Sequence, residues 1–245
     1  MRKLFTAKVL ISLLLPVAAF AAGAPAAPVE YKALVDVGSW PAVMKAYGPG
    51  LPVKEIEIYF YDTPGLALYQ RGLVLRARTG KKRGDSTVKM RPAPPALPPG
   101  VSAARGFKCE YDSGPAASVY SCSLTSRQEN GKIAAAAAGG AKAGKLFSGP
   151  QKAWAGGVDW DKLRALGPVK SSSWEAASPG LKTLSFERWD LPGGPSFLEV
   201  SFRAPGRAEA EEGIKTLHAE LQRLGVKLAE GQSSKTRAAM DFFSK

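Results

Sequence analysis

Polar and apolar residues alternate along many short stretches of the chain, which is the pattern of half-buried β-strands. Most of these stretches are separated by short segments rich in glycine, proline, aspartate or serine, which favour turns. The pattern predicts strands over residues 29–37, 54–61, 73–79, 86–91, 107–112, 119–124, 182–190 and 196–203.

Three other segments have the spacing of short amphipathic helices. In residues 39–48, Ser39 is expected to cap a helix that buries one apolar face, including Met44. Residues 159–167 begin with an aspartate and end at a glycine, which predicts a second helix. The clearest helix is expected over residues 209–224, where leucines and an isoleucine form a stripe.

Two segments fit neither pattern. Residues 92–100 are rich in proline, which cannot donate ladder hydrogen bonds, so we expect a surface excursion. Residues 130–145 have low complexity and are expected to be a mobile insertion, although their alanines could extend a helix. With no fixed-period repeat or internal boundary, residues 29–245 are expected to form one domain.

The first residues have the form of a secretory signal peptide. Arg2, Lys3 and Lys8 accompany a short apolar run, and small residues follow it. We expect residues 1–21 to be removed, residues 22–28 to form a flexible lead, and the mature protein to be periplasmic or secreted. The apolar run is too short for a membrane span, so no stable membrane insertion is expected.

The chain is strongly basic and has two cysteines. Its 34 Lys and Arg residues exceed its 21 Asp and Glu residues, which favours acidic partners without choosing among them. Cys109 and Cys122 lie in predicted strands, where either a disulfide across one hairpin or two unpaired thiols would fit an exported protein. The oligomeric state is left open.

Charged residues repeat at every second position of several predicted strands. Side chains at such positions share one face, as Arg76 and Arg78 do, and Lys89 and Arg91. In one strand this would indicate a solvated face. Because several successive strands repeat it, the charges would converge in a lumen if the sheet closes into a barrel, an architecture in which inner and outer faces alternate in this way. Buried cations need anionic partners, so a polyanion is the expected ligand.

Five stretches together resemble the CYTH superfamily, the triphosphate tunnel metalloenzymes. Residues 59–78 (YFYDTPGLALYQRGLVLRAR) and 87–91 (TVKMR) are the most specific. Residues 108–112 (KCEYD), 197–202 (FLEVSF) and 234–236 (SKT) agree in order and kind. The resemblance implies an α+β fold, in which about eight strands form a closed or nearly closed antiparallel β-barrel, the triphosphate tunnel, with flanking helices. It also implies a triphosphate or polyphosphate ligand and a magnesium or manganese cofactor. The superfamily includes triphosphatases for inorganic, thiamine and RNA substrates as well as adenylate cyclases.

Carried over by position, the resemblance assigns two sets of residues. The residues that would bind phosphate are Lys32, Arg76, Arg78, Lys89, Arg91, Lys108, Arg188 and Lys235. Those that would bind the metal are Glu30, Glu110 and Glu199. No residue is assigned as the catalytic group.

Two positions depart from the family pattern and subtract metal ligands. Pro28 stands where the opening strand usually has its first glutamate, and Ser201 follows Glu199 where a second acid is usual. Asp112 is considered as a substitute ligand. Whether Arg188 or the preceding glutamate faces inward depends on register, because a slip of one residue reverses the face.

Three functions follow from these features. The first is an exported metal-dependent phosphohydrolase acting on inorganic triphosphate, polyphosphate or an organic triphosphate. The alternative is a non-catalytic protein that binds polyphosphate or another polyanion in the same basic tunnel. The third is a basic surface protein that contacts anionic lipid or glycan. Nucleic acid is disfavoured because the tryptophans are scattered. His218 is expected on an exposed helix face, and Lys81, Lys82 and Arg83 in a solvated hairpin tip.

Overall fold

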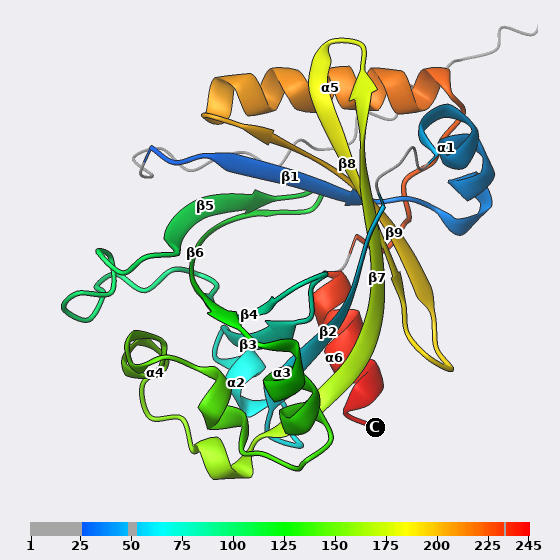
Figure 1. Ribbon diagram of the computed structural model, residues 1–245. Coiled ribbons are helices and arrows are strands. Elements are labelled where there is room, and N and C mark those ends of the chain that lie inside the picture. Colours follow the sequence, from blue (N-terminus) through cyan, green and yellow to red (C-terminus); the bar gives the residue numbers. More distant parts are fainter. Residues whose placement is uncertain (1–25, 49–52, 233) are drawn as a thin grey trace, which may run out of the picture.

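The protein is a closed β-barrel with helices packed around it (Figure 1). The computed structural model describes residues 26–48, 53–232 and 234–245. The predicted signal peptide, residues 1–21, and most of the predicted lead therefore lie outside the described residues. Neighbouring strands in the barrel follow the order β1-β5-β6-β4-β3-β2-β7-β8-β9.

The strands lie close to the predicted ranges, with one addition. Their bounds are β1 Val29–Leu34, β2 Lys54–Asp62, β3 Leu73–Arg78, β4 Gly84–Met90, β5 Phe107–Ser113, β6 Ser118–Gln128, β7 Arg164–Ser178, β8 Leu181–Asp190 and β9 Ser196–Ala204. All neighbouring pairs are antiparallel except β1 and β5, which are parallel. The barrel is thus mixed rather than purely antiparallel, and β1 closes it by pairing with both β5 and β9.

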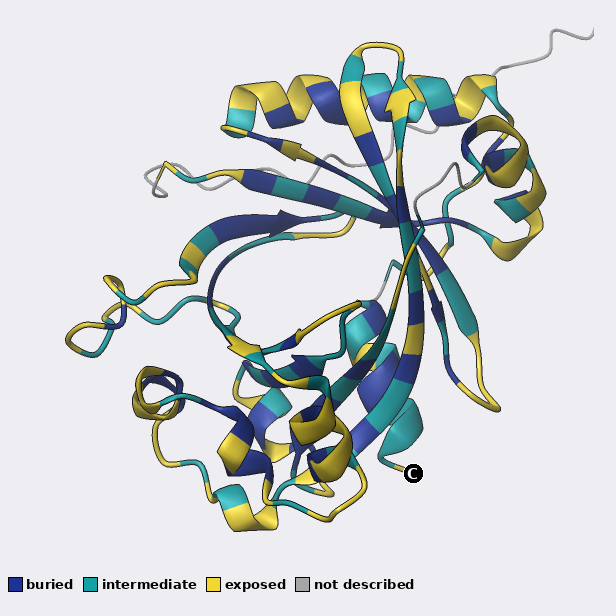
Figure 2. Ribbon diagram, viewed as in Figure 1, coloured by how far each residue is buried: buried dark blue, intermediate teal, exposed yellow. Residues whose placement is uncertain are grey.

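A long helix covers one side of the barrel exterior. α5 (Arg207–Arg223) packs Ile214, Leu217 and Leu221 against the outward side chains of β1, β8 and β9. The alternation of buried and half-buried residues along β1 is visible in Figure 2. In β1, β8 and β9 the more apolar face therefore points outward to α5, and the charged residues of the site point into the barrel.

The low-complexity segment is ordered against another side of the barrel. Its alanines form α3 (Asn130–Ala137), and the 3₁₀ turn η2 (Ala143–Leu146) follows. Ile133 is fully buried among residues of β3, β4 and β6. The expectation of a mobile insertion is corrected, and its helical alternative is what the structure contains. α4 (Gly149–Ala155), which was not predicted, adjoins this cluster.

A C-terminal helix lies on the inner side of the barrel. α6 (Lys235–Phe243) packs Ala239 and Met240 against Ile58, Val169 and Trp189. By register, these three residues share the face of the strands that carries the inward charges. α6 therefore fills the apolar part of the lumen beside β2, β7 and β8.

Two smaller helices complete the fold. α1 (Trp40–Tyr47) forms as predicted, but Met44 is exposed and Ser39 makes no side-chain cap. The Ser39 hydroxyl instead accepts a hydrogen bond from the amide of Lys227. α2 (Ala67–Gln70) follows β2, and the Asp62 carboxylate accepts its first amide hydrogen bonds. A 3₁₀ turn, η1 (Val37–Ser39), precedes α1.

The predicted helix over residues 159–167 is wrong. Only the 3₁₀ turn η3 (Trp160–Lys162) forms there, and β7 begins at Arg164. Leu166, expected on a helix face, is buried in the strand against β2. In the described part of the chain, no helix is long and apolar enough to cross a membrane.

Candidate functional site

The register of the strands determines which charged residues face the lumen. In β3, Leu73, Leu75 and Ala77 join the outer core, so Arg76 and Arg78 point inward. Applied around the barrel, the same alternation places a set of acids and a larger set of bases in the lumen. The bases include Lys32, Arg76, Arg78, Lys89, Arg91, Lys108, Arg127 and Arg203, together with Lys235 of α6, and the acids include Glu30, Asp85, Glu110, Asp112, Glu175, Glu187 and Glu199.

Asp112 is the most heavily paired acid of the lumen. Its carboxylate lies 3.3 Å from the Lys32 Nζ, 2.6 Å from the Lys89 Nζ and 2.5 Å from an Arg91 guanidinium nitrogen. The Ser121 hydroxyl donates to it at 2.6 Å. Burial alone would raise the pKa of Asp112, but the three cations hold it well below its usual range. Asp112 is thus an anion surrounded by three of the cations that the resemblance assigned to phosphate binding.

Two further carboxylates lie beside Asp112. Glu30 accepts from Lys32 at 2.6 Å and from Arg203 at 2.9 Å. Burial opposes its ionisation, yet these two cations lower the pKa of Glu30 to about 2. Glu110 pairs with Lys108 at 2.9 Å.

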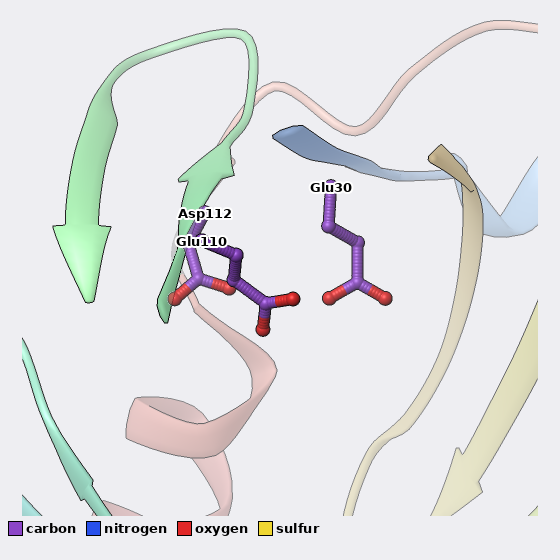
Figure 3. Close-up of side chains that lie close together, drawn as sticks. All are labelled: Glu30, Glu110 and Asp112. Carbon is purple, nitrogen blue, oxygen red and sulfur yellow. The ribbon is translucent and has the colours of Figure 1, made fainter. Parts of the chain in front are cut away.

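The three carboxylates converge from two strands. Oxygen atoms of Glu30, Glu110 and Asp112 all lie within 4.8 Å of one another (Figure 3). Glu30 comes from β1, and the other two come from alternate positions of β5, which the parallel pairing sets beside β1. Glu199, expected in this group, is not part of it.

Glu199 belongs to a second charged group at the start of α6. The ammonium of Lys235 lies 3.1 Å from Glu199 and also bonds Glu187. It sits 4.5 Å from the centre of the Trp189 ring. Burial opposes ionisation of Glu187, but Lys235 and hydrogen bonds that include one from Ser171 lower its pKa to about 2.

Two inward cations lie in surroundings that disfavour their charged form. Arg76 has no ion-pair partner among the described residues, and its Nε is buried without a hydrogen bond. Burial and the nearby Arg78 lower the pKa of Arg76 to about 10. The pKa of Lys89 falls to about 8 because it is buried near Lys32 and Arg91, with Asp112 only partly compensating. Both groups would gain from an anion in the lumen.

Arg188 does not face the lumen. Its guanidinium stacks 5.4 Å from the Trp40 ring and pairs with Asp190 at 2.9 Å on the outer face. Glu187, one residue earlier, points inward to Lys235. The placement of Arg188 among the phosphate ligands is therefore corrected, because the register of β8 puts the arginine on the opposite face.

The two cysteines form a disulfide between β5 and β6. Cys109 and Cys122 occupy directly opposite positions, with Cα atoms 4.0 Å apart. The link joins the strand that carries Lys108, Glu110 and Asp112 to its neighbour. It leaves no free cysteine among the described residues.

Sequence reasoning assigned no site role to five charged residues of the inner face, one of which is Glu175 on the unpredicted strand β7. Arg203 lies two residues beyond Ser201 on the inward face of β9, so the alternation already carried its signal. Glu187 was left open against Arg188. Asp85 and Arg127 lie at strand ends beyond the predicted ranges, where periodicity gave no guidance.

Comparisons with known proteins agree on the fold. No protein-family model matches the sequence, and no curated protein matches it. A solved structure from Bacillus halodurans, described as a candidate adenylate cyclase, superposes with a TM-score of 0.57 and 15% identity over 86% of this chain and 96% of its own.

A second solved structure, from Hippeastrum, is described as a candidate adenylyl cyclase with a dominant triphosphatase activity. It superposes with a TM-score of 0.59 and 16% identity over 88% of this chain and 95% of its own. The matches span most of this chain and almost the full length of both neighbours. The chain therefore shares the closed-barrel fold of these structures, which is the CYTH-like fold that the sequence resemblance predicted.

Proposed function

We propose that this protein binds the phosphate chain of inorganic triphosphate or polyphosphate in its barrel and hydrolyses it with the help of Mg²⁺ or Mn²⁺. An organic triphosphate is a further substrate of the same class. The observation that carries the proposal is the ring of inward cations, which exceeds the acids available to neutralise it. The triphosphatase activity named for the Hippeastrum protein supports the same substrate class.

The cations suit a chain of phosphates because they line the lumen in rows. Arg76 and Arg78 follow one strand, Lys89 and Arg91 its neighbour, and Lys32 lies on a strand across the lumen. One cation at 4 Å from a phosphate charge is worth roughly 4 kcal/mol at an effective dielectric of about 20, before desolvation. Arg76, which has no ion pair in the described residues, is the first such contact we expect.

The cluster of Glu30, Glu110 and Asp112 fits a hard divalent cation. Its donors are all carboxylate oxygens, which Mg²⁺ and Mn²⁺ prefer, and they come within 4.8 Å of one another. The low pKa of Glu30 keeps it ionised at neutral pH, ready to act as a ligand. A bound divalent ion would neutralise phosphate charge and so assist cleavage.

Cations of the lumen would position the phosphate chain for cleavage. Lys32, Lys89 and Arg91, now held by Asp112, would turn to phosphate oxygens when the ligand enters. Their fixed charges would stabilise the charge that develops on the transferred phosphoryl group. No P-loop pattern occurs in the sequence, so the lumen supplies these contacts in its place.

The test measures phosphate release and binding in parallel. Purified protein is incubated with triphosphate, ATP or polyphosphate, with Mg²⁺, Mn²⁺ or a chelator, and binding is followed by calorimetry. We expect metal-dependent release that Arg76→Ala and Glu110→Gln reduce, whereas Lys215→Ala on the exposed face of α5 does not. Metal binding alone, without substrate, should weaken in Glu110→Gln.

Two other results would favour a different function. Tight binding with no phosphate release by clean protein would favour the alternative, a non-catalytic polyphosphate-binding tunnel. Pro28 and Ser201 support that alternative, because they stand where the family usually has metal-binding acids. Failure to bind any of these ligands would reject both, leaving the basic surface protein.

We also propose that the protein works outside the cytosol. The signal-like N-terminus motivates this, and the disulfide between Cys109 and Cys122 supports it, because such bonds persist in oxidising compartments. Fractionation of expressing cells tests it, and full-length protein confined to the cytosol would contradict it.

A further inference from the structure

A basic hollow of about 680 Å³ opens at the tip of the β3–β4 hairpin. Four cations from two elements line it. They are Lys81, Lys82 and Arg83 at the hairpin tip and Arg127 near the end of β6. The remaining lining residues are Gly84, Asp85 and Thr125.

The hollow continues the lumen. Asp85 and Arg127 are opposite each other in the register of β4 and β6, and Asp85 is opposite Arg78 in β3. Arg78 ends the inward row that starts at Arg76, and it holds Asp85 in a two-pronged ion pair at 2.9 and 3.1 Å. Asp85, the only acid among the lining residues of the hollow, is therefore already paired with Arg78 of the lumen.

The four cations of the hollow have no such partner. Within the part of the chain that the structure describes, neither the three tip residues nor Arg127 forms an ion pair, and all four are exposed. Like charges gathered at one place repel one another, so an anion is the complement that the hollow lacks.

The hairpin tip is held in place rather than left as a free loop. The Asn130 side chain at the start of α3 accepts from the Gly80 amide at 3.2 Å and donates to the Gly80 carbonyl at 2.7 Å. Gly84 packs so tightly that a Cβ would lie 2.1 Å from the Arg78 carbonyl oxygen and 2.5 Å from the Ile133 side chain. The low-complexity segment thus fixes the position of the tip and its charges.

We infer that this hollow binds the phosphate units of a long chain that extend beyond the tunnel, so that long-chain polyphosphate is preferred over triphosphate. The inference rests on the proposed function of the lumen and adds a second anion site to it. A triphosphate is short enough to engage the inner rows alone, whereas a long chain leaving the lumen past Arg78 would reach Lys81, Lys82, Arg83 and Arg127.

The test compares chain lengths in one triple variant. Lys81→Ala/Lys82→Ala/Arg83→Ala should weaken binding of long-chain polyphosphate by about tenfold, since several exposed contacts that are individually weak are lost together. Affinity for triphosphate should stay within about twofold of wild type. The matched control is Lys45→Ala/Lys182→Ala/Lys215→Ala, which removes the same charge from exposed residues elsewhere and should change neither affinity.

A second variant tests the placement of the tip without changing any charge. Asn130→Ala removes both bonds to Gly80, and we expect it to lower the preference for long chains while triphosphate affinity is retained. The ratio of the two affinities is the readout, because a general loss of stability would lower both together.

The outcomes separate the two proposals. If wild type binds triphosphate but the tip variant matches wild type on long chains, or the control loses as much, the hollow is not a polyphosphate site. The same conclusion follows if wild type binds an RNA oligonucleotide more tightly than polyphosphate and the tip variant loses only the RNA. If wild type binds neither phosphate ligand, the lumen proposal itself fails.

Discussion

At the scale of single residues, the carboxylate of Asp112 occupies the position among the lumen cations that an anionic ligand would take. Asp112 collects Lys32, Lys89 and Arg91, three groups that would otherwise repel one another in a confined space. This arrangement limits the cost of burying the cations before a ligand arrives. Under the proposed function, entry of phosphate would replace the Asp112 carboxylate with another anion rather than neutralise unpaired cations.

The charge of Lys89 should set the upper pH limit of binding. Its pKa is about 8, so it loses its proton as the pH rises from 7 to 9, and triphosphate affinity should fall over that interval. Lys89→Arg keeps its charge over the same range and should flatten the decline. Titration calorimetry at each pH, with identical ligand solutions, checks this, and parallel profiles for the two proteins would refute it.

The ion pair of Glu187 with Lys235 should stabilise the protein only above acidic pH. The pKa of Glu187 is lowered in the folded state to about 2 from its ordinary value of 4.5. Its contribution is therefore complete above about pH 5 and is lost as the pH falls toward 2. Glu187→Gln should cost roughly 2 kcal/mol at pH 7 and almost nothing near pH 2.

Denaturant unfolding at the two pH values measures this difference. A cost for Glu187→Gln that is equal at both would show that the glutamate acts through packing instead. Glu175→Gln, on an exposed position of β7, is the matched control and should have little effect at either pH.

At the scale of elements, alternation along the strands predicted most of the inward charges but could not fix register everywhere. In β3 the apolar and basic positions differ sharply, so the inward face was evident from the sequence. In β8, Glu187 and Arg188 are both polar, and only pairing with β7 and β9 decides between them. β7 was not predicted at all, and over its start an aspartate, spaced leucines and a glycine imitate a helix.

The register of β8 leads to a direct comparison. Arg188→Ala should leave triphosphate affinity unchanged, since the side chain lies outside the barrel against Trp40. Arg76→Ala should reduce it by about tenfold or more, because a buried cation facing the ligand is removed. A binding titration of both variants checks the prediction, and a comparable loss in Arg188→Ala would show that the inward face of β8 is misassigned.

The disulfide should stabilise the β5–β6 pair that presents the carboxylates. Cys109 and Cys122 are separated by 13 positions, and closing a loop of that size is worth about 3 kcal/mol. Cys109→Ala/Cys122→Ala should therefore lower the free energy of unfolding by about this amount in denaturant. Reduction of wild type should give a similar loss, and no loss in either case would contradict the prediction.

At the scale of the whole molecule, the sequence indicated a barrel but not which charged residues of distant strands lie side by side within it. The cluster of Glu30, Glu110 and Asp112 depends on β1 lying parallel to β5, a pairing between strands far apart in the chain. Alternation within one strand carries no information on such long-range neighbours. For the same reason the sequence grouped Glu199 with Glu30 and Glu110, whereas the structure pairs it with Lys235.

Enclosure of the site predicts a difference in salt dependence. Charges inside the barrel are screened less than those at the surface, so triphosphate affinity should fall less between about 0.1 and 0.5 M NaCl than the added affinity for long-chain polyphosphate. Titrations at both salt concentrations measure this. Equal losses for the two ligands would place both on the outer surface.

The position of β1 has a consequence for how the chain folds. This strand is the first to be synthesised, yet its partners are β5 and the much later β9. The partner of one edge, β5, is complete at Ser113, but the other edge stays unpaired until β9 exists, and contacts so distant in sequence form slowly. Closure of the barrel must therefore wait for its last strand, and chains cut short before residue 196 would expose two open sheet edges prone to aggregation.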